Sequence, residues 1–173
     1  MKEIFVNNEN LKDEEIEEEA TRVKGLIIND NDEILLGYSY SCYQFPGGHM
    51  EGDEDILEVL KREVKEEAGM DIDVSNAKPF LLSRFYIKNY TKTGKNRHNK
   101  IYYVLVRTNE KPNVENTNYT KEELIGNYAL RYVKKDKIID TLIENCKLHP
   151  VSKYITNEML LALDCYFKQE EKK

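Results

Sequence analysis

Three glutamates occur at a spacing that suits metal binding: Glu63, Glu66 and Glu67 stand at positions i, i+3 and i+4. In a helix, residues three and four apart are neighbours, so these carboxylates would share one surface. Glu67 also falls within the apolar arc of the same segment. Because a buried, unpaired carboxylate is costly, a positive charge must compensate it. Carboxylate oxygens suit hard divalent cations, and the pattern therefore predicts magnesium, or alternatively manganese, at this helix.

The residues directly upstream favour the same chemistry. Gly47 and Gly48 allow close approach of the backbone and can offer carbonyl oxygens to an ion. Glu54 adds an acid where it favours the dipole at the start of the helix, and Arg62 can pair with one of the glutamates. The loop lacks the Gly-Lys-Ser/Thr ending of a P-loop, so we expect phosphate to bind through the metal. The alternative is a solvated acidic helix face paired with lysines.

A longer pattern contains all of these acids. It reads Gly48-x5-Glu54-x7-Arg62-Glu63-Val64-x-Glu66-Glu67-x-Gly69-Met70. At every position it resembles the Nudix box, G-x5-E-x7-R-E-U-x-E-E-x-G-U, in which U is aliphatic or similar. The Phe-Pro-Gly sequence that ends at Gly47 is similar to the usual lead-in of that family.

This resemblance implies an α/β/α sandwich with a mixed β-sheet. It also implies magnesium-dependent hydrolysis of a diphosphate that is joined to another group, usually a nucleoside. The implied metal ligands are Glu63, Glu66, Glu67 and the backbone carbonyl of Gly47. In the same scheme Arg62 orients the carboxylate of Glu63, and Glu54 supports the cluster.

The resemblance leaves the base that deprotonates the attacking water open. Glu66 or Glu67 can serve if the metal does not fully occupy it. Some family members place such an acid on a distant loop, where Glu122 and Glu123 stand here; the alternative for this pair is an exposed helix start. Two other functions share the fold, a non-catalytic nucleotide-binding module and a prenyl-diphosphate isomerase. The intact acids argue against the module, and the complete box argues against the isomerase, although Cys42 lies shortly before the box.

A basic segment at residues 91–100 is predicted to contact the substrate. It carries four cations in a chain of net charge −6: Lys92, Lys95, Arg97 and Lys100. We expect Lys95 and Arg97 to contact a distal phosphate, and Tyr86 nearby to stack on a base. Tyr86 also lies near the place where diadenosine-polyphosphate members of the family carry a tyrosine. A solvated hairpin tip is the alternative.

The hydrophobic pattern predicts an α/β (α+β) layered domain around these residues. It predicts strands at residues 23–28, 33–38, 80–90, 101–107 and 128–133, and helices at residues 53–68, 138–146 and 156–169. Gly69 would end the first helix. Residues 1–173 are interpreted as one domain, with an acidic N-terminal extension at residues 1–20 and a C-terminal helix within residues 150–173. The acidic run at residues 13–19 is expected to be solvated.

Composition excludes several classes of function. The chain has 173 residues, a net charge of −6, and three cysteines without CxxC spacing. An acidic chain does not fit a general DNA-binding protein, and no apolar run is long enough to span a membrane. The cysteine spacing fits neither a zinc site nor a disulfide framework, which favours a cytoplasmic setting. We therefore expect a small-molecule nucleotide as partner. The apolar side of residues 156–169 would cover the core or join a homodimer, and we favour packing within the chain.

Overall fold

A mixed seven-stranded sheet organises the protein, whose residues 1–172 are described by a computed structural model. The strand order is β1-β5-β6-β2-β3-β4, and β7 also pairs with β3. The strands are β1 (Lys2–Val6), β2 (Glu18–Ile28), β3 (Glu33–Ser39), β4 (Cys42–Gln44), β5 (Lys78–Ile87), β6 (Arg97–Arg107) and β7 (Ala129–Lys134). The pairs β1/β5 and β2/β6 are parallel, and the other pairs are antiparallel.

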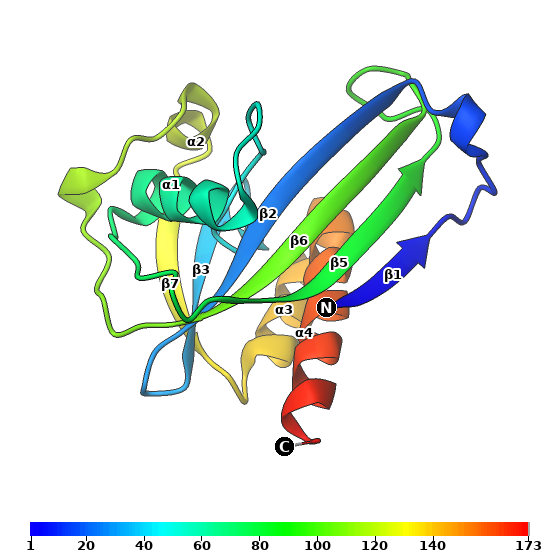
Figure 1. The fold of residues 1–173 in the computed structure, drawn as a ribbon. Coiled ribbons are helices and arrows are strands. Elements are labelled where there is room, and N and C mark those ends of the chain that lie inside the picture. The colour runs from blue at the N-terminus through cyan, green and yellow to red at the C-terminus, as the bar shows by residue number, and fades with distance from the viewer. Residues whose placement is uncertain (173) are drawn as a thin grey trace.

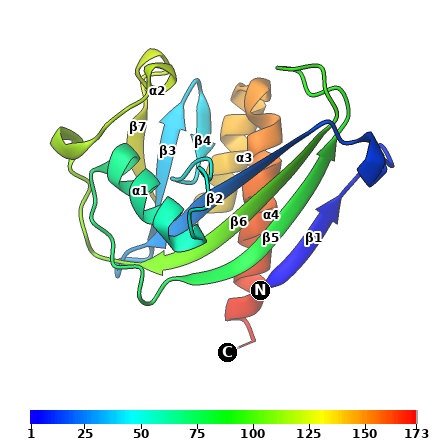
Figure 2. The same cartoon turned by 45° about the horizontal axis from the view of Figure 1, so that its top comes forward.

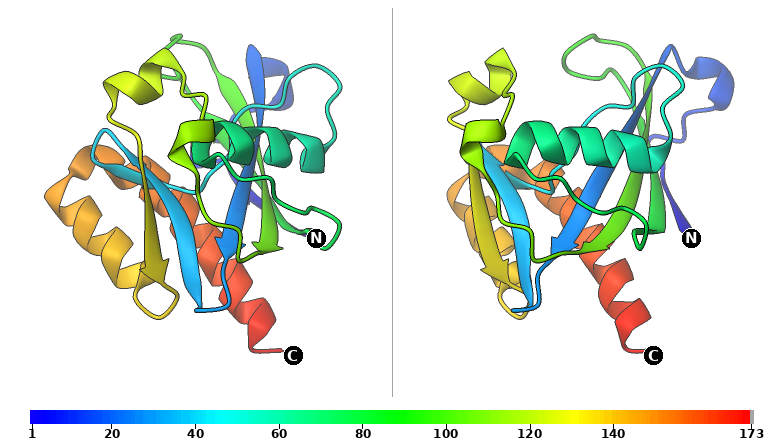
Figure 3. Two further views of the ribbon diagram at one scale, coloured as in Figure 1. Left: turned by 90° about the vertical axis from the view of Figure 1, so that its left-hand side faces the viewer. Right: turned by 60° about the vertical axis from the view of Figure 1, so that its left-hand side comes forward.

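Helices cover both faces of this sheet. They are α1 (Ile56–Ala68), α2 (Lys121–Ile125), α3 (Ile138–Leu148) and α4 (Lys153–Glu170), with short 3-10 turns η1 (Asp13–Glu15), η2 (Val114–Asn116) and η3 (Pro150–Ser152). Helix α1 lies on one face, and α3 and α4 lie on the other (Figures 1 and 3). The α/β/α arrangement with a mixed sheet, expected from the sequence, is therefore confirmed.

The alternation of side chains along β2 builds a separate core on each face. Val23 and Ile27 pack with the buried face of α1, whereas Leu26 and Ile28 pack with α3 and α4. Arg22 and Lys24 point to this second side by register, so two charged side chains precede its apolar residues along β2. Both positions become important at the functional site.

Helix α1 begins later than the expected residue 53. The side chain of Asp55 caps it by accepting a hydrogen bond from the Leu57 N–H at 2.8 Å, and Glu58 completes a capping box. The helix ends as predicted at Gly69, which adopts the left-handed conformation with φ of 65°. Glu54 consequently lies in the turn before the helix, where its carboxylate accepts a hydrogen bond from Arg62.

The acidic run is only partly solvated, because its last residues enter the sheet. Strand β2 begins at Glu18, and in its parallel pairing with β6 Glu18 faces Arg97. The two side chains form an ion pair of 3.5 Å, and Glu19 pairs with Lys100 at 2.9 Å. The positive charges of β6 therefore compensate the negative charges of these two glutamates, a residue type that otherwise disfavours a strand. The prediction of a solvated run is therefore wrong for Glu18, which is half-buried, whereas Glu19 stays exposed within the strand.

Residues 1–20, interpreted from the sequence as an extension, contribute two pieces to the sheet. Strand β1 pairs with β5 at the edge of the sheet (Figure 2), and the first residues of β2 continue its centre. The connection between them contains the exposed turn η1. Neither β1 nor the short strand β4 is evident from the hydrophobic pattern.

The C-terminal helix packs within the chain, as favoured from the sequence. Met159, Leu163 and Tyr166 of α4 are buried in the core on their face of the sheet. All three cysteines are free thiols. Within residues 1–172 no helix has both the length and the apolar character that a bilayer-spanning segment requires.

Candidate active site

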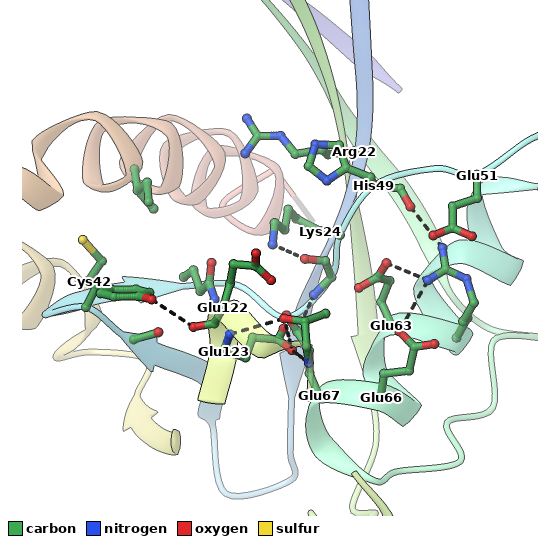
Figure 4. A pocket seen from close by; sticks show the side chains of 18 of the residues that line it. Arg22, Lys24, Cys42, His49, Glu51, Glu63, Glu66, Glu67, Glu122 and Glu123 are labelled. Carbon is green, nitrogen blue, oxygen red and sulfur yellow. Dashed lines mark hydrogen bonds and ion pairs between the residues drawn. The ribbon is translucent and has the colours of Figure 1, made fainter. Parts of the chain in front are cut away.

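A pocket of about 650 Å³ opens where α1, the loop before it, β2, the β3–β4 turn, α2 and the start of α4 meet. Figure 4 shows the glutamates of α1 projecting into this pocket, with Lys24 of β2 near them and Arg22 of the same strand directed toward the C-terminal helix. Segments that are far apart in sequence thus supply both acidic and basic groups to one cavity.

Arg62 connects most of the acidic groups. Its guanidinium contacts both oxygens of Glu54, at 2.8 and 2.9 Å. It also donates to Glu63 at 2.7 Å and lies 3.5 Å from Glu66. A fifth contact, 3.0 Å to the carbonyl of His49, ties the helix to the preceding loop. Bidentate pairing of this kind fixes orientation, and it lowers the pKa of Glu54 to about 2.

Glu67 is the most deeply buried acid of the pocket, with 4% of its surface exposed. Its carboxylate accepts a hydrogen bond from the Gly47 N–H at 2.8 Å. Burial raises the pKa of Glu67 to about 7, although Lys24 and that hydrogen bond both favour the ionised form. The compensation within the described residues is therefore incomplete, and the site favours an additional cation when Glu67 is charged.

Lys24 is a residue of the pocket that sequence reasoning missed. Its amino group donates a hydrogen bond to the carbonyl of Gly47. Burial lowers the pKa of Lys24, and the neighbouring carboxylates of Glu67 and Glu63 oppose that shift. The signal in the sequence was a single lysine within the apolar run at residues 23–28. On the alternating pattern of a strand, such a residue points into the interior and requires a partner.

Tyr128 lies close to the carboxylate of Glu67. Its hydroxyl is buried and has no partner of ordinary hydrogen-bond geometry in the described part of the chain. Burial raises the pKa of Tyr128, and the nearby charge of Glu67 raises it further, so the hydroxyl stays a proton donor. The ring fits because residue 37 is glycine: a Cβ there would stand 2.2 Å from the hydroxyl oxygen. The sequence showed Tyr128 only as the first residue of a strand.

The donor set of the pocket fits a hard divalent cation. Glu63, Glu66, Glu67 and Gly47 all line it, and oxygen ligands are those that magnesium and manganese prefer. In the present arrangement no three acidic, histidine or cysteine side chains among residues 1–172 converge closely enough to share an ion. Glu63 and Glu66 point to Arg62, and Glu67 points to the Gly47 N–H. Ion binding would therefore exchange some of these contacts for metal–oxygen contacts.

Glu122 and Glu123 also line the pocket. The carboxylate of Glu123 accepts hydrogen bonds from the backbone N–H and hydroxyl of Thr120, at 2.6 and 2.9 Å. It is thus a capping residue of α2, which matches the helix-start alternative. Its charge nevertheless contributes to the raised pKa of Glu67, so α2 brings it close to the acids of α1.

The residues predicted to bind substrate are not brought to the pocket. Arg97 contacts Glu18 and Asn99, and its guanidinium lies 4.4 Å from the ring centre of Tyr90. Tyr86 stacks on His98 with ring centres 4.5 Å apart and donates to Asp13 at 3.0 Å. Lys95 is exposed in the loop. The sequence could not show that the acidic run would occupy this hairpin, whose Lys92 alone among its four cations lines the pocket.

The chain thus has an α/β/α fold, and a glycine loop leads into an acidic helix that faces a pocket. Comparison with known proteins identifies the family to which this combination belongs. The model of the NUDIX domain matches residues 19–147, and the chain belongs to this family. The structure of the MutT protein from Bacillus halodurans is similar in fold, with a TM-score of 0.53 and 22% identity over 70% of this chain and 72% of that one.

A curated relative matches a shorter segment. The "8-oxo-dGDP phosphatase NUDT18" of Danio rerio is 43% identical over 54 residues, which cover 28% of this chain and 17% of that protein. The match thus spans less than a fifth of the relative's length.

Proposed function

We propose that this protein is a magnesium-dependent hydrolase that cleaves a diphosphate linkage in a nucleoside diphosphate derivative or a nucleoside triphosphate. The observation that carries the proposal is the joining of an acidic, oxygen-rich wall and basic side chains in one pocket. Membership of the NUDIX family supports it, because hydrolases of this family use a divalent metal. We infer a cytoplasmic setting from the three free thiols.

The side chains divide the work of such a reaction. When bound, magnesium would polarise the phosphoryl oxygens and stabilise charge on the leaving phosphate. Glu63, Glu66, Glu67 and the Gly47 carbonyl would hold it. Arg62 keeps the carboxylates of Glu63 and Glu66 in place through the contacts described above. Glu66, Glu67 or Glu123 would accept the proton of the attacking water, since each lines the pocket.

A screen of nucleotides with magnesium tests this proposal. The panel should contain nucleoside triphosphates, nucleoside diphosphate derivatives and oxidised guanine nucleotides, because the zebrafish relative is an 8-oxo-dGDP phosphatase. We expect at least one compound to yield a nucleoside monophosphate, together with pyrophosphate, phosphate or the phosphate ester of the attached group, identified by mass. Binding without any product would instead assign a nucleotide-binding module.

A prenyl diphosphate in the same panel tests the isomerase alternative. Cys42 lines the pocket, which is the one observation in favour of that reaction. Burial raises the pKa of its thiol, however, and so disfavours the thiolate. A product of unchanged mass would assign the isomerase and overturn the hydrolase.

Replacement of Tyr128 by phenylalanine is expected to lower turnover roughly 5- to 10-fold, which corresponds to the free energy of about one hydrogen bond. The reason is that the buried hydroxyl is available to orient Glu67 once this carboxylate binds an ion or receives a proton. The Michaelis constant and the thermal midpoint should stay close to those of the parent, because the ring is retained. Kinetics of Tyr132→Phe, which lies on strand β7 directly after Tyr128 and is exposed, provide the control. Equal turnover in the two variants would remove Tyr128 from the mechanism.

A further inference from the structure

The C-terminal helix α4 reaches the pocket although it lies beyond the segment that matches the family, residues 19–147. Ile155, in its first turn, lines the cavity. Three residues later, Glu158 is 6% exposed and forms an ion pair with Arg22 of β2 at 3.3 Å. Arg22 itself lines the pocket. The helix therefore touches the site twice, once through an apolar side chain and once through a charge.

Glu158 is an unusual residue on the inner face of this helix. Its neighbours Met159, Leu163 and Tyr166 are buried and apolar or aromatic. Burial raises the pKa of Glu158, and the largest opposing influence is the charge of Arg22. Replacing a buried ion pair by apolar groups is often neutral or stabilising. Packing of α4 alone therefore does not account for this carboxylate, and its position beside a pocket arginine suggests a role in the site.

Arg22 keeps most of its hydrogen-bonding capacity. A guanidinium has five N–H donors, and among residues 1–172 only Nη2 has a side-chain partner, namely Glu158. The side chain of Arg22 is 21% exposed, in contact with the cavity. Figure 4 shows Arg22 beside Lys24, with Glu63 and Glu67 on the wall formed by α1. An anion held by a metal at those glutamates would thus have a guanidinium within the same cavity.

We propose that Arg22 binds phosphate oxygens of the nucleotide substrate that the metal does not coordinate, and that Glu158 is the positioning residue that aims Arg22 into the pocket. This inference rests on the proposed function. The planar guanidinium matches two phosphate oxygens at once and is always charged. By fixing one edge of the guanidinium, Glu158 reduces the rotamer freedom lost on binding. Helix α4 is in this way part of the substrate site as well as of the core.

Steady-state kinetics of Arg22→Gln, Glu158→Gln and the double variant test this inference, with the best substrate of the screen. A charge-assisted contact is worth ~1.5–3 kcal/mol, so Arg22→Gln should raise the Michaelis constant roughly 10- to 100-fold. Turnover should change less than about threefold, since Arg22 does not hold the proposed metal. Glu158→Gln should raise the Michaelis constant less, and the double variant should match Arg22→Gln, because Glu158 acts only through Arg22.

A purely structural ion pair predicts a different result. The single variants would then lower the thermal midpoint and leave the Michaelis constant unchanged, which would overturn the inference. Arg22→Lys, which retains the charge but not the planar fork, keeps the test valid if the glutamine variant fails to fold; it should still raise the Michaelis constant. Arg84→Gln is the matched control, because Arg84 pairs with Glu3 on another part of the sheet and does not line the pocket.

Calorimetric binding of a non-hydrolysable methylene analogue of a nucleoside triphosphate separates the two proposals. If the parent binds the analogue but hydrolyses no nucleotide, the proposed function fails, and the affinity ratio of parent to Arg22→Gln still decides the inference. A ratio of roughly 10 or more supports it, and a ratio near one overturns it. If the parent neither hydrolyses nor binds any probe, both proposals are overturned.

Discussion

Replacing Glu67 by glutamine is expected to lower turnover at least ~100-fold while the protein stays folded. The variant loses a negative charge at the proposed metal site, which weakens both ion binding and the stabilisation of charge on the phosphate. The fold should persist because the amide can still accept the hydrogen bond from the Gly47 N–H. A neutral amide is also less costly to bury than a carboxylate at a position that is 4% exposed. Glu66→Gln should have a similar effect on turnover.

Lys65→Gln is the control for this experiment. Lys65 is adjacent to Glu66 in sequence but pairs with Asp71 at 2.5 Å on the outer side of α1. Its loss should change turnover little, and circular dichroism of all variants would establish that each is folded. If Lys65→Gln were as harmful as Glu66→Gln, the assignment of the catalytic face of α1 would be wrong.

Removal of divalent cations is expected to abolish turnover. Glu63, Glu66 and Glu67 repel the phosphates of a nucleotide, and the basic groups of the pocket do not replace a divalent ion beside Glu67, whose pKa burial raises to about 7. The protein should be dialysed against a chelator and assayed with the substrate from the screen. Addition of magnesium or manganese should restore turnover.

A thermal-shift titration offers an assay of the same metal site that is independent of activity. An ion that binds only the folded protein raises its thermal midpoint as the ion concentration exceeds the dissociation constant. The rise should disappear in Glu67→Gln and persist in Lys65→Gln. Full turnover in excess chelator would contradict a metal-dependent mechanism.

The sequence was sufficient for the parts of the site that are local along the chain. The i, i+3, i+4 spacing placed Glu63, Glu66 and Glu67 on one face of α1, and the structure shows that all three line the pocket. Arg62 pairs with Glu63, the contact that the family resemblance implied, and also with Glu54, a partner that the sequence did not specify. These contacts lie within one helix and the turn before it.

The remaining parts depend on pairings between distant segments. The cations of the hairpin were expected at the substrate, but the register of β2 against β6 places Glu18 opposite Arg97 instead. Lys24 lines the pocket because β2 carries it there. Tyr128 comes close to Glu67, and Glu158 pairs with the pocket residue Arg22, only because the fold brings distant segments together. No periodicity within one segment encodes such contacts, although a charge in an apolar strand or helix face signals that a partner exists.

The parallel pairing of β2 with β6 sets an order in which the protein can fold. Glu18 meets Arg97 and Lys2 meets Leu81, so each pairing closes a chain segment of about 80 residues before it gains any contact. The hairpin of β5 and β6 closes a much shorter loop, as Ile87 faces Arg97. Closure entropy thus favours this hairpin as the template on which β2 and then β1 assemble, and topology of this kind slows folding. On the ribosome, α1 follows β2 and β3, whose Val23, Ile27 and Leu35 it packs against, whereas β6, which adds Val104 and Val106 to the same core, is synthesised later.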